Sequence, residues 1–363
     1  MVKGKEDVLL SCMSNTIIHG DCLEVMGRIP DNSIDLILTD PPYFKVKKEW
    51  WDRQWDNPTL FMEWIGKLSQ EWQRILKPNG SLYCFASPKM AARVEVKLGE
   101  KFNIVNRIIW QKPPFATKAE MFVKEDLRGF FPASESIVFC EHYGADNFAK
   151  GEAGYAAKCD ELRGFLFEPL SEYLKAERDK AGWQNEDAKK AVGHSPKSGC
   201  HWFDKSQWCL PTQLVYESWQ RLSDCFLRPY EELRQEYEEL RQEYEELRRP
   251  FSVTADVPYT DVWSFPTVQF YRGKHPCEKP SLLLEHIIKA SSREGATVLD
   301  CFAGSGSTLL AAKRLNRKYI GIEIDREWVD YAEARLSQKY RAGLPNKKAK
   351  VKPVPHGQLS LFD

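Results

Sequence analysis

An acid, two prolines and two aromatic residues follow directly after an apolar run early in the chain. The run from Ile34 to Thr39 is typical of a buried strand, and it ends in Asp40-Pro41-Pro42-Tyr43-Phe44. The Asp40 carboxylate and the Pro41 carbonyl could accept the two hydrogens of an amine, and the prolines fix the direction of that carbonyl. Tyr43 and Phe44 could stack on a flat ring that carries the amine. The alternative is a turn that only ends the strand, since Asp and Pro both favour turns.

A second connection, from a strand to a helix, carries two glycines. Thr297 to Asp300 is typical of a buried strand, and Gly304 and Gly306 stand just before a helical pattern. Such glycines let the backbone approach a ligand, and the start of a helix offers free N–H groups. Glu323 ends the next strand, 17 residues after Gly306, where an acid suits a ribose diol. Because the dinucleotide fingerprint and the P-loop lysine are both missing, the loop predicts an adenosine-bearing cofactor without a pyrophosphate. A glycine turn without a ligand is the alternative.

Read together, these segments resemble the amino-DNA methyltransferases, which use S-adenosylmethionine. Asp40 to Tyr43 resembles the D-P-P-Y catalytic motif of that family, and Phe302 to Gly306 resembles its F-x-G-x-G cofactor loop. The catalytic motif comes first, which is similar to the order of the β-class enzymes. The resemblance covers roughly residues 15–145 and 270–340. It includes four further segments: Ile18-His19-Gly20-Asp21, Leu76-Lys77-Pro78-Asn79-Gly80, Trp110-Gln111-Lys112 and His275-Pro276-Cys277-Glu278-Lys279-Pro280.

The resemblance implies a role for each matching residue. Asp40, Pro41, Pro42 and Tyr43 are the expected catalytic residues, with Tyr43 and Phe44 stacking on a base that has been flipped out of the duplex. Glu323 would bind the ribose hydroxyls of the cofactor, Asp21 would approach its adenine, and Lys279 would bind its carboxylate. The other expected cofactor-binding residues are Asp40, Asp300, Phe302, Ala303, Gly304, Ser305, Gly306, Ser307 and Thr308. Helix capping is the alternative role for Ser307 and Thr308.

The first residue of the catalytic motif bears on the choice of base. In the family, Asp at this position usually accompanies N6-adenine methylation, and Ser usually accompanies N4-cytosine methylation. Asp40 therefore favours a site-specific N6-adenine DNA methyltransferase of the restriction–modification type. An N4-cytosine enzyme is the alternative within the family. From another class, the chain could be a DNA-binding regulator without catalysis, but intact Asp40, Gly304 and Glu323 speak against that.

The alternation of strand and helix patterns predicts an α/β fold. Short apolar runs alternate with helical spacing in residues 1–150, which hold the catalytic motif, and again in residues 261–342, which hold the cofactor loop. We therefore expect a mainly parallel sheet. The resemblance implies a Rossmann-like methyltransferase fold, with a seven-stranded sheet flanked by helices and a helical target-recognition domain inserted at residues 151–260.

The insertion carries two patterns that bear on function. Residues 184–190 and 198–202, on either side of Val192-Gly193, resemble a helix-turn-helix. An insertion that only packs is the alternative. Tyr and Leu residues then recur in a heptad pattern from Tyr230 to Leu247. We favour packing of this stripe within the chain over a coiled-coil dimer contact. The candidates for DNA contact are Lys197, Ser198, His201 and Lys205.

Composition limits the remaining classes. The chain holds 52 cationic and 52 acidic residues, so double-stranded DNA has to meet a local basic patch. Ten cysteines without a C-x-x-C pair indicate a reduced, intracellular protein. Cys200, His201 and Cys209 fit no common zinc module, so we expect no metal. No apolar run reaches the roughly 20 residues of a membrane span. We expect a cytoplasmic protein, of bacterial or phage origin and associated with the nucleoid, and a homodimer is a further expectation.

The last part of the chain, residues 343–363, is Lys- and Pro-rich but ends in an apolar peptide. We expect a flexible basic tail. The peptide Q-L-S-L-F resembles the one by which bacterial replication and repair proteins bind the sliding clamp. Docking of the tail on its own domain, or a chance match, is the alternative. The candidate clamp-binding residues are Gln358, Leu359, Leu361 and Phe362.

Overall fold

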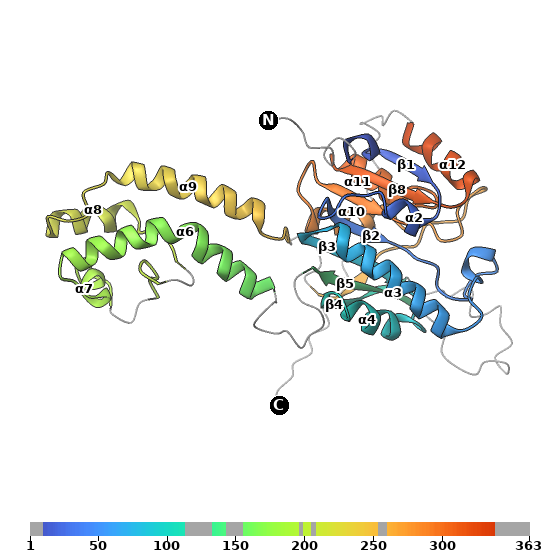
Figure 1. The fold of residues 1–363 in the computed structure, drawn as a ribbon, viewed down its shortest axis with the longest axis horizontal. Coiled ribbons are helices and arrows are strands. Elements are labelled where there is room, and N and C mark those ends of the chain that lie inside the picture. Colours follow the sequence, from blue (N-terminus) through green and yellow to red (C-terminus); the bar gives the residue numbers. More distant parts are fainter. Residues whose placement is uncertain are drawn as a thin grey trace, which may run out of the picture.

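The fold is built on an eight-stranded sheet with the order β1-β8-β7-β2-β3-β5-β4-β6 (Figure 1). The computed structural model describes residues 10–112, 133–142, 155–195, 199–204, 208–252 and 260–337. Within these residues, β5 alone runs antiparallel to its neighbours β3 and β4, and every other pair of strands is parallel. The strands are β1 Thr16–His19, β2 Ile34–Thr39, β3 Leu76–Ala86, β4 Asn103–Gln111, β5 Ser134–Glu141, β6 Val262–Ser264, β7 Thr297–Asp300 and β8 Lys318–Glu323.

The expected fold class is confirmed, with one strand more than the seven predicted. The additional strand is β6, which has only three residues and pairs with β4 at the edge of the sheet. A run this short leaves no periodicity to recognise in the sequence. It pairs Val262 with Ile109 and Trp263 with Trp110, and the Trp110 indole N–H donates to the carbonyl of Phe265 at 2.9 Å.

Helices cover both faces of the sheet. Because side chains alternate along a strand, Leu82 and Cys84 of β3 enter one core, while Tyr83 and Phe85 enter the other. The first core is closed by α2 Cys22–Met26, α3 Pro58–Ile75 and α4 Ala91–Gly99. The second core is closed by α10 Ser281–Ser291, α11 Ser307–Arg314 and α12 Arg326–Ser337.

Local sequence explains where the main covering helix begins and which face it buries. The Asn57 side chain caps α3 by accepting from the backbone N–H groups of Thr59 and Leu60, and Pro58 occupies the first turn. The buried residues of α3 recur at helical spacing, so one stripe faces the sheet. That stripe consists of Phe61, Ile65, Leu68, Ser69, Trp72 and Ile75.

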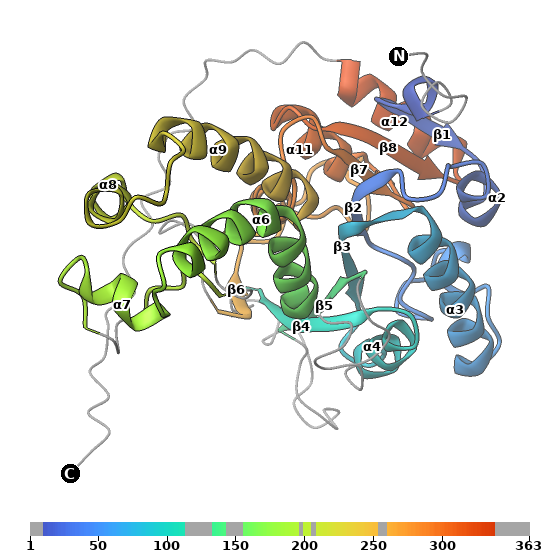
Figure 2. The same ribbon diagram turned by 60° about the vertical axis from the view of Figure 1, so that its left-hand side comes forward.

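Four helices form a lobe that projects from the sheet, as Figures 1 and 2 show. They are α6 Tyr155–Lys180, α7 Asn185–Lys190, α8 Gln213–Leu222 and α9 Tyr230–Leu247. The lobe has a hydrophobic core of its own, centred on residues such as Leu170, Tyr216, Trp219 and Phe226, none of which is exposed. A separate core lets these helices hold their shape apart from the sheet.

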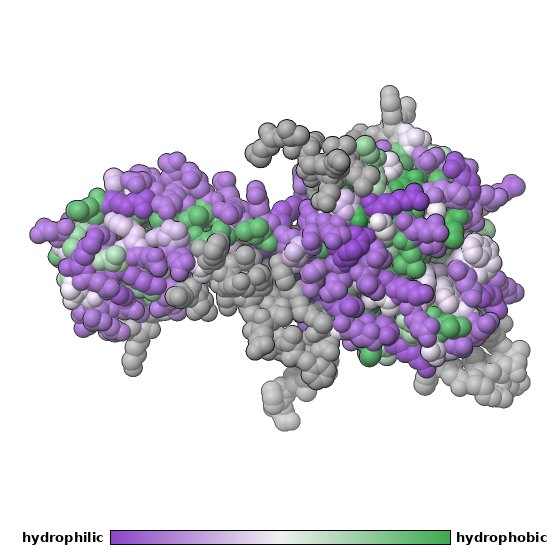
Figure 3. Space-filling model, in the orientation of Figure 1, coloured by the Kyte–Doolittle hydropathy of each residue, from purple (hydrophilic) through white to green (hydrophobic). Residues whose placement is uncertain are grey.

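The heptad stripe of α9 packs inside this lobe. Leu233 and Tyr244 are buried, and Tyr230, Tyr237 and Leu240 pack against the same core. The visible side of α9 is mainly hydrophilic in Figure 3. Packing within the chain, which the pattern favoured, is therefore what the lobe shows, and these five residues are not available for a coiled coil.

The helix-turn-helix prediction is only half right. The first helix exists as α7, capped by Gln184 and Asp187, and Gly193 follows it with a φ of 74°. The predicted second helix is wrong for its described part, because residues 199–204 are irregular. The adjacent rings of Trp202 and Phe203 are both buried in the lobe core, and the Trp208 indole donates to the Trp202 carbonyl at 2.7 Å.

The C-terminal end of α9 is fastened to the sheet domain. The Arg293 guanidinium donates to the carbonyls of Glu245 and Arg248, and the Asn79 amide donates to that of Glu246 at 3.0 Å. Arg249 follows and forms a buried ion pair with Glu141 at 3.1 Å. These contacts satisfy carbonyls that the helix end leaves without partners of its own.

No helix in the described ranges is both long enough and apolar enough to cross a membrane.

Candidate active site

The catalytic and cofactor motifs meet because their strands are neighbours in the sheet. β2 and β7 are parallel, with Leu36 opposite Val298 and Ile37 opposite Leu299, so both motifs leave the sheet at the same edge. Thr39 joins them directly. Its hydroxyl donates to Oδ1 of Asp300 at 3.2 Å and accepts from the backbone N–H of Cys301 at 3.2 Å. Ligands of open α/β sheets bind at this carboxyl edge.

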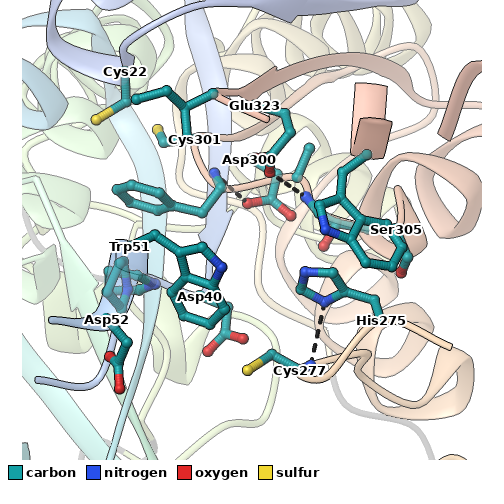
Figure 4. A pocket seen from close by; sticks show the side chains of 18 of the residues that line it. Cys22, Asp40, Trp51, Asp52, His275, Cys277, Asp300, Cys301, Ser305 and Glu323 are labelled. Carbon is teal, nitrogen blue, oxygen red and sulfur yellow. Dashed lines mark hydrogen bonds between the residues drawn. The ribbon is translucent and has the colours of Figure 1, made fainter. Parts of the chain in front are cut away.

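A pocket lies at this edge, enclosing about 1070 Å³ of space that is partly open to solvent. In Figure 4, Asp300 and Glu323 lie on one side of the pocket, and Asp40, Trp51 and Cys277 on the other. One pocket is therefore lined by residues of both the catalytic motif and the cofactor loop. Of the residues predicted from the sequence, it is lined by Asp21, Asp40, Pro41, Pro42, Tyr43, Lys279, Asp300, Phe302, Ala303, Gly304, Ser305, Ser307, Thr308 and Glu323.

Asp40 lies at the catalytic end of the pocket as half of a buried ion pair. Its Oδ2 accepts from the ammonium of Lys279, which lies over the rings of Tyr43 and Phe85 at 5.2 and 4.9 Å. Its Oδ1 is buried and makes no hydrogen bond among the described residues, because the nearby Tyr43 hydroxyl donates to Glu135. Burial raises the pKa of Asp40 above its usual value, and Lys279 and the Tyr43 hydroxyl oppose that rise. Lys279 thus pairs with the catalytic carboxylate while it lines the pocket, and its expected contact with the cofactor's carboxylate stays a prediction.

Glu135 gathers the groups around this pair. It is the second residue of β5, and its Oε1 accepts from Lys112 Nζ at 2.5 Å while its Oε2 accepts from the Tyr43 hydroxyl at 3.0 Å. Lys279 Nζ lies 3.5 Å from the same Oε2. Burial opposes ionisation of Glu135, but Lys279 and Lys112 together outweigh that effect and lower its pKa to about 2. The site therefore contains a row of four alternating charges, in the order Asp40, Lys279, Glu135 and Lys112.

The glycine loop lies against a histidine. Gly304 has a φ of 47°, and a Cβ added there would lie 3.0 Å from Cε1 of His275. Nδ1 of His275 accepts from the backbone N–H of Cys277 at 3.2 Å, so its proton resides on Nε2 in the neutral ring. Burial lowers the pKa of His275 to about 4, with Lys279 adding to the effect. His275 is therefore neutral near pH 7.

Two acids flank the glycine loop. Glu323 accepts from the backbone N–H of Gly304 at 2.8 Å and from that of Asp325 at 2.9 Å, and burial raises its pKa. Asp300 accepts from the backbone N–H of Phe302 at 3.1 Å, and burial raises its pKa to about 6. Both carboxylates thus fix the loop, and both remain in the wall of the pocket.

Three candidate residues of the cofactor set have structural duties. Gly306 does not line the pocket. Its φ is 71°, and a Cβ there would come within 2.9 Å of Ala332 on α12, so it serves the turn and the packing of that helix. Ser307 begins α11 and Oδ1 of Asp21 caps α2, although both residues also line the pocket.

Phe44 does not do what the sequence predicted. It adopts a φ of 62°, which turns its ring away from the pocket and toward Phe61 of α3, with 5.5 Å between ring centroids. Phe44 therefore belongs to the first core and is not among the pocket-lining residues. A reversed backbone direction at one residue cannot be read from an aromatic pair in sequence.

The loop after the catalytic motif contributes Trp51 to the pocket. Trp50–Asp52 forms a short 3-10 helix, and the Trp51 ring stacks on His275 with 6.4 Å between centroids. Asp52 is fully buried and accepts from the backbone N–H groups of Tyr43 and Lys47, both at 2.5 Å. Trp55 of the same loop packs into the first core, while Trp51 lines the pocket.

The candidate DNA-contacting and clamp-binding residues are only partly described. His201 lies in the irregular segment of the lobe, and its Nδ1 bonds Asp204 at 2.7 Å. The other candidate residues lie outside the described part of the chain: Lys197, Ser198, Lys205, Gln358, Leu359, Leu361 and Phe362.

Sequence reasoning missed three residues of the site. Glu135 comes from the antiparallel strand and belongs to no motif. His275 lies in a segment that had drawn attention only for its Lys279. Trp51 lies in a stretch rich in Lys and Trp, but neither its stacking partner nor its direction follows from spacing. All three depend on which strands and loops become neighbours.

Comparison with known proteins bears on this geometry. The chain is 28% identical over 370 residues to the DNA adenine methyltransferase YhdJ of Escherichia coli (strain K12), an alignment that covers 99% of this chain and 95% of the relative. It is 25% identical over 341 residues to the type II methyltransferase M2.DpnII of Streptococcus pneumoniae, covering 88% of each.

A solved structure has the same fold. The PvuII DNA methyltransferase (cytosine-N4-specific) matches with a TM-score of 0.50 and 16% identity, over 90% of this chain and 87% of that one. The sequence model of the DNA methylase family N6_N4_Mtase matches residues 34–334, which include both motifs and the lobe. The chain therefore belongs to the N6/N4 family of DNA methylases.

Proposed function

We propose that this protein transfers a methyl group from S-adenosylmethionine to N6 of an adenine flipped out of double-stranded DNA, at specific sites. The observation that carries the proposal is the Asp40 carboxylate, which is paired through Oδ2 while Oδ1 stays buried without a partner. A buried acceptor without a donor is costly, so such an atom suits a donor that a substrate brings. The relative named as a DNA adenine methyltransferase supports adenine as the base.

The catalytic motif prepares the amine. An exocyclic amine is a poor nucleophile because its lone pair is delocalised into the ring. Asp40 Oδ1 and the Pro41 carbonyl accept its two hydrogens and thereby turn the lone pair out of the plane of the base. Tyr43 holds the base by stacking, and its hydroxyl bond to Glu135 fixes the ring. When bound, S-adenosylmethionine supplies the electrophilic methyl carbon.

Asp40 can also take up the proton that the amine releases after methylation. The amine nitrogen carries a positive charge once it has gained the methyl group, so it is a strong acid and loses one proton to become neutral. Oδ1 of Asp40 already accepts a hydrogen bond from that amine, so it is the nearest base. Because burial raises its pKa, Asp40 is a better proton acceptor than an exposed aspartate.

The other end of the pocket suits the cofactor. Glu323 would hold the ribose hydroxyls, Asp21 would approach the adenine, and the loop from Phe302 to Ser305 would let the ligand approach its backbone. A Cβ at Gly304 would meet His275, so only glycine leaves room at this point of the loop. This supports a loop whose backbone a ligand can approach closely. The Nε2–H of neutral His275 is a further candidate donor for the cofactor's carboxylate, beside Lys279.

The test uses tritium-labelled S-adenosylmethionine and duplex DNA, followed by sequencing with base-modification detection. We expect label in N6-methyladenine at one sequence. Asp40→Asn should abolish transfer and leave cofactor affinity unchanged by calorimetry, because Glu135 still neutralises Lys279. Asp56→Ala, at an exposed aspartate in the same segment, is the matched control. Label in N4-methylcytosine would overturn the choice of base, and no label in any DNA would favour the DNA-binding regulator.

Recognition of the site belongs to the lobe in this proposal. His201, in the irregular segment 199–204, would contact the DNA, and Lys197, Ser198 and Lys205 are the other candidates for such contacts. Replacing His201 by Ala should change the methylated sequence or weaken DNA binding. Equal binding and an unchanged sequence would contradict this assignment.

Further partners follow from the same reading. The protein would act in the bacterial cytoplasm, at the nucleoid, within a restriction–modification system, and it would bind the sliding clamp through its last residues. Deletion of residues 358–362 should abolish capture of the protein on immobilised clamp, and unchanged capture would end the idea. The homodimer expectation is tested by sedimentation equilibrium.

A further inference from the structure

Glu135 connects three segments that are far apart in the chain. Its carboxylate accepts from Lys112 just after β4 and from the Tyr43 hydroxyl just after β2. It also lies 3.5 Å from the ammonium of Lys279, just before α10. Glu135 is not among the pocket-lining residues, so it does not touch the ligands of the proposed reaction.

The position of Lys279 decides which oxygen of Asp40 remains available. The ammonium contacts Oδ2 of Asp40 on one side and faces Glu135 on the other. An ammonium carries three donors and can slide along a carboxylate, because it lacks the rigid fork of a guanidinium. Without the pull of Glu135, Lys279 would be free to bridge both oxygens of Asp40. Oδ1, the acceptor for the substrate amine, would then be occupied.

The same carboxylate holds the stacking ring. Tyr43 has its hydroxyl on Glu135 and its backbone N–H on Asp52, so both ends of this residue are held. Loss of the hydroxyl contact would free the ring about its side-chain torsions. A base stacked on a mobile ring presents its amine to Asp40 in the right direction less often.

We propose that Glu135 is the positioning residue of the active site: it draws Lys279 to one oxygen of Asp40 and anchors Tyr43, so that the other oxygen stays open for the target amine. The inference rests on the proposed function and deepens it. It gives the antiparallel strand β5 a part in catalysis, which no motif of the chain indicates.

The test is Glu135→Gln, which keeps size and hydrogen bonding but removes the charge. We expect the rate of methyl transfer at saturating substrates to fall at least about tenfold, on the scale of one hydrogen bond to a charged group. The KM for cofactor and the affinity for DNA should stay within about twofold, because Glu135 touches neither ligand.

A change in pH profile separates positioning from mere stability. Asp40 is faced by Lys279, Glu135, Tyr43, Cys84, Cys277 and Asp300, and Glu135 is the acidic neighbour that raises the pKa of Asp40 most. Removing that charge should move the acidic limb of the rate profile to lower pH. Asp35→Asn is the matched control. Asp35 is a part-buried carboxylate that binds Lys77 at 2.6 Å and the N–H of Thr297 at 2.8 Å, at the other end of β2.

Two outcomes would overturn the inference. The first is an unchanged rate and acidic limb in Glu135→Gln. The second is a lower rate in Glu135→Gln that is fully explained by a smaller amount of folded protein, together with an equal fall in rate in Asp35→Asn. If the wild-type protein transferred no methyl group, infrared titration of the Asp40 carboxyl, assigned with Asp40→Asn, would still decide. A lower Asp40 pKa in Glu135→Gln supports the positioning role, and an equal pKa refutes it.

Discussion

The ammonium of Lys279 contacts Oδ2 of Asp40, although the two residues are 239 positions apart in the chain. The contact exists because β2 delivers Asp40 to the edge of the sheet where the segment before α10 passes. Burial alone would favour the neutral carboxylic acid, which is a poor acceptor for an amine hydrogen. Lys279 therefore favours the ionised form of the catalytic carboxylate against the effect of burial.

Replacing Lys279 by Met should move the pH dependence of methyl transfer. Transfer needs ionised Asp40, and the ionised fraction falls about tenfold for each pH unit below the pKa. Burial raises that pKa and Lys279 lowers it, so removing Lys279 shifts the acidic limb to higher pH and lowers the rate at pH 7. The measurement is the rate at saturating substrates from pH 5 to 9. Lys274→Met is the control, since its ammonium binds only the Val268 carbonyl in the described chain. An acidic limb that stays in place would contradict this role.

Gly304→Ala should weaken cofactor binding more than its backbone strain explains. A left-handed conformation costs a residue with a side chain about 1–2 kcal/mol. Gly295 has the same sign of φ, 78°, with nothing within 4 Å of an added Cβ, so Gly295→Ala reports that strain alone. At Gly304 the new methyl would also press on His275. Calorimetric titration with cofactor should show a loss of at least about tenfold for the first variant and little for the second. Equal affinities would mean that the loop does not contact the ligand.

Replacing Phe44 should lower the stability of the protein, whereas replacing Tyr43 should lower its activity. Phe44→Ala removes partly buried packing against Phe61 and should lower the free energy of unfolding by about 2 kcal/mol. Its rate per folded molecule should stay near that of the wild type. Tyr43→Ala should lower the rate by at least about tenfold through loss of base stacking. Chemical denaturation and initial rates test both variants. A Phe44→Ala protein with normal stability but a reduced rate of methyl transfer would show that Phe44 takes part in the active site.

The buried pair of Arg249 and Glu141 should stabilise the junction between lobe and sheet. The two side chains are 6% and 3% exposed, with 3.1 Å between Nε and Oε2. Arg249→Met leaves a buried carboxylate without that partner, which should cost about 3–5 kcal/mol in thermal or denaturant unfolding. The exposed pair of Arg326 and Asp330 gives the contrast, because Arg326→Met should cost less than about 1 kcal/mol. Similar losses in both variants would show that burial of the pair adds nothing.

Local sequence determined much of this protein. The D-P-P-Y turn, the glycine loop and Glu323 each lie at a strand end, where periodicity and turn residues are informative over a few positions. Parallel strands then bring those ends to one edge, so a pocket made of these motifs could be predicted, as could the packing of the α9 stripe. Short-range physics also explains the caps of α3 and α7.

Tertiary structure decided the electrostatics and the direction of single side chains. The partnership of Asp40, Lys279 and Glu135 depends on three segments that only the sheet order makes neighbours. Phe44 lies outside the pocket in a turn where Phe44 and Lys45 both have positive φ. The segment predicted as a recognition helix is irregular over residues 199–204 and buries the rings of Trp202 and Phe203 in the lobe core. These contacts and side-chain directions depend on the free energy of packing and desolvation over the whole chain. A short stretch of sequence does not determine that free energy, because the contacting residues lie far apart in the sequence.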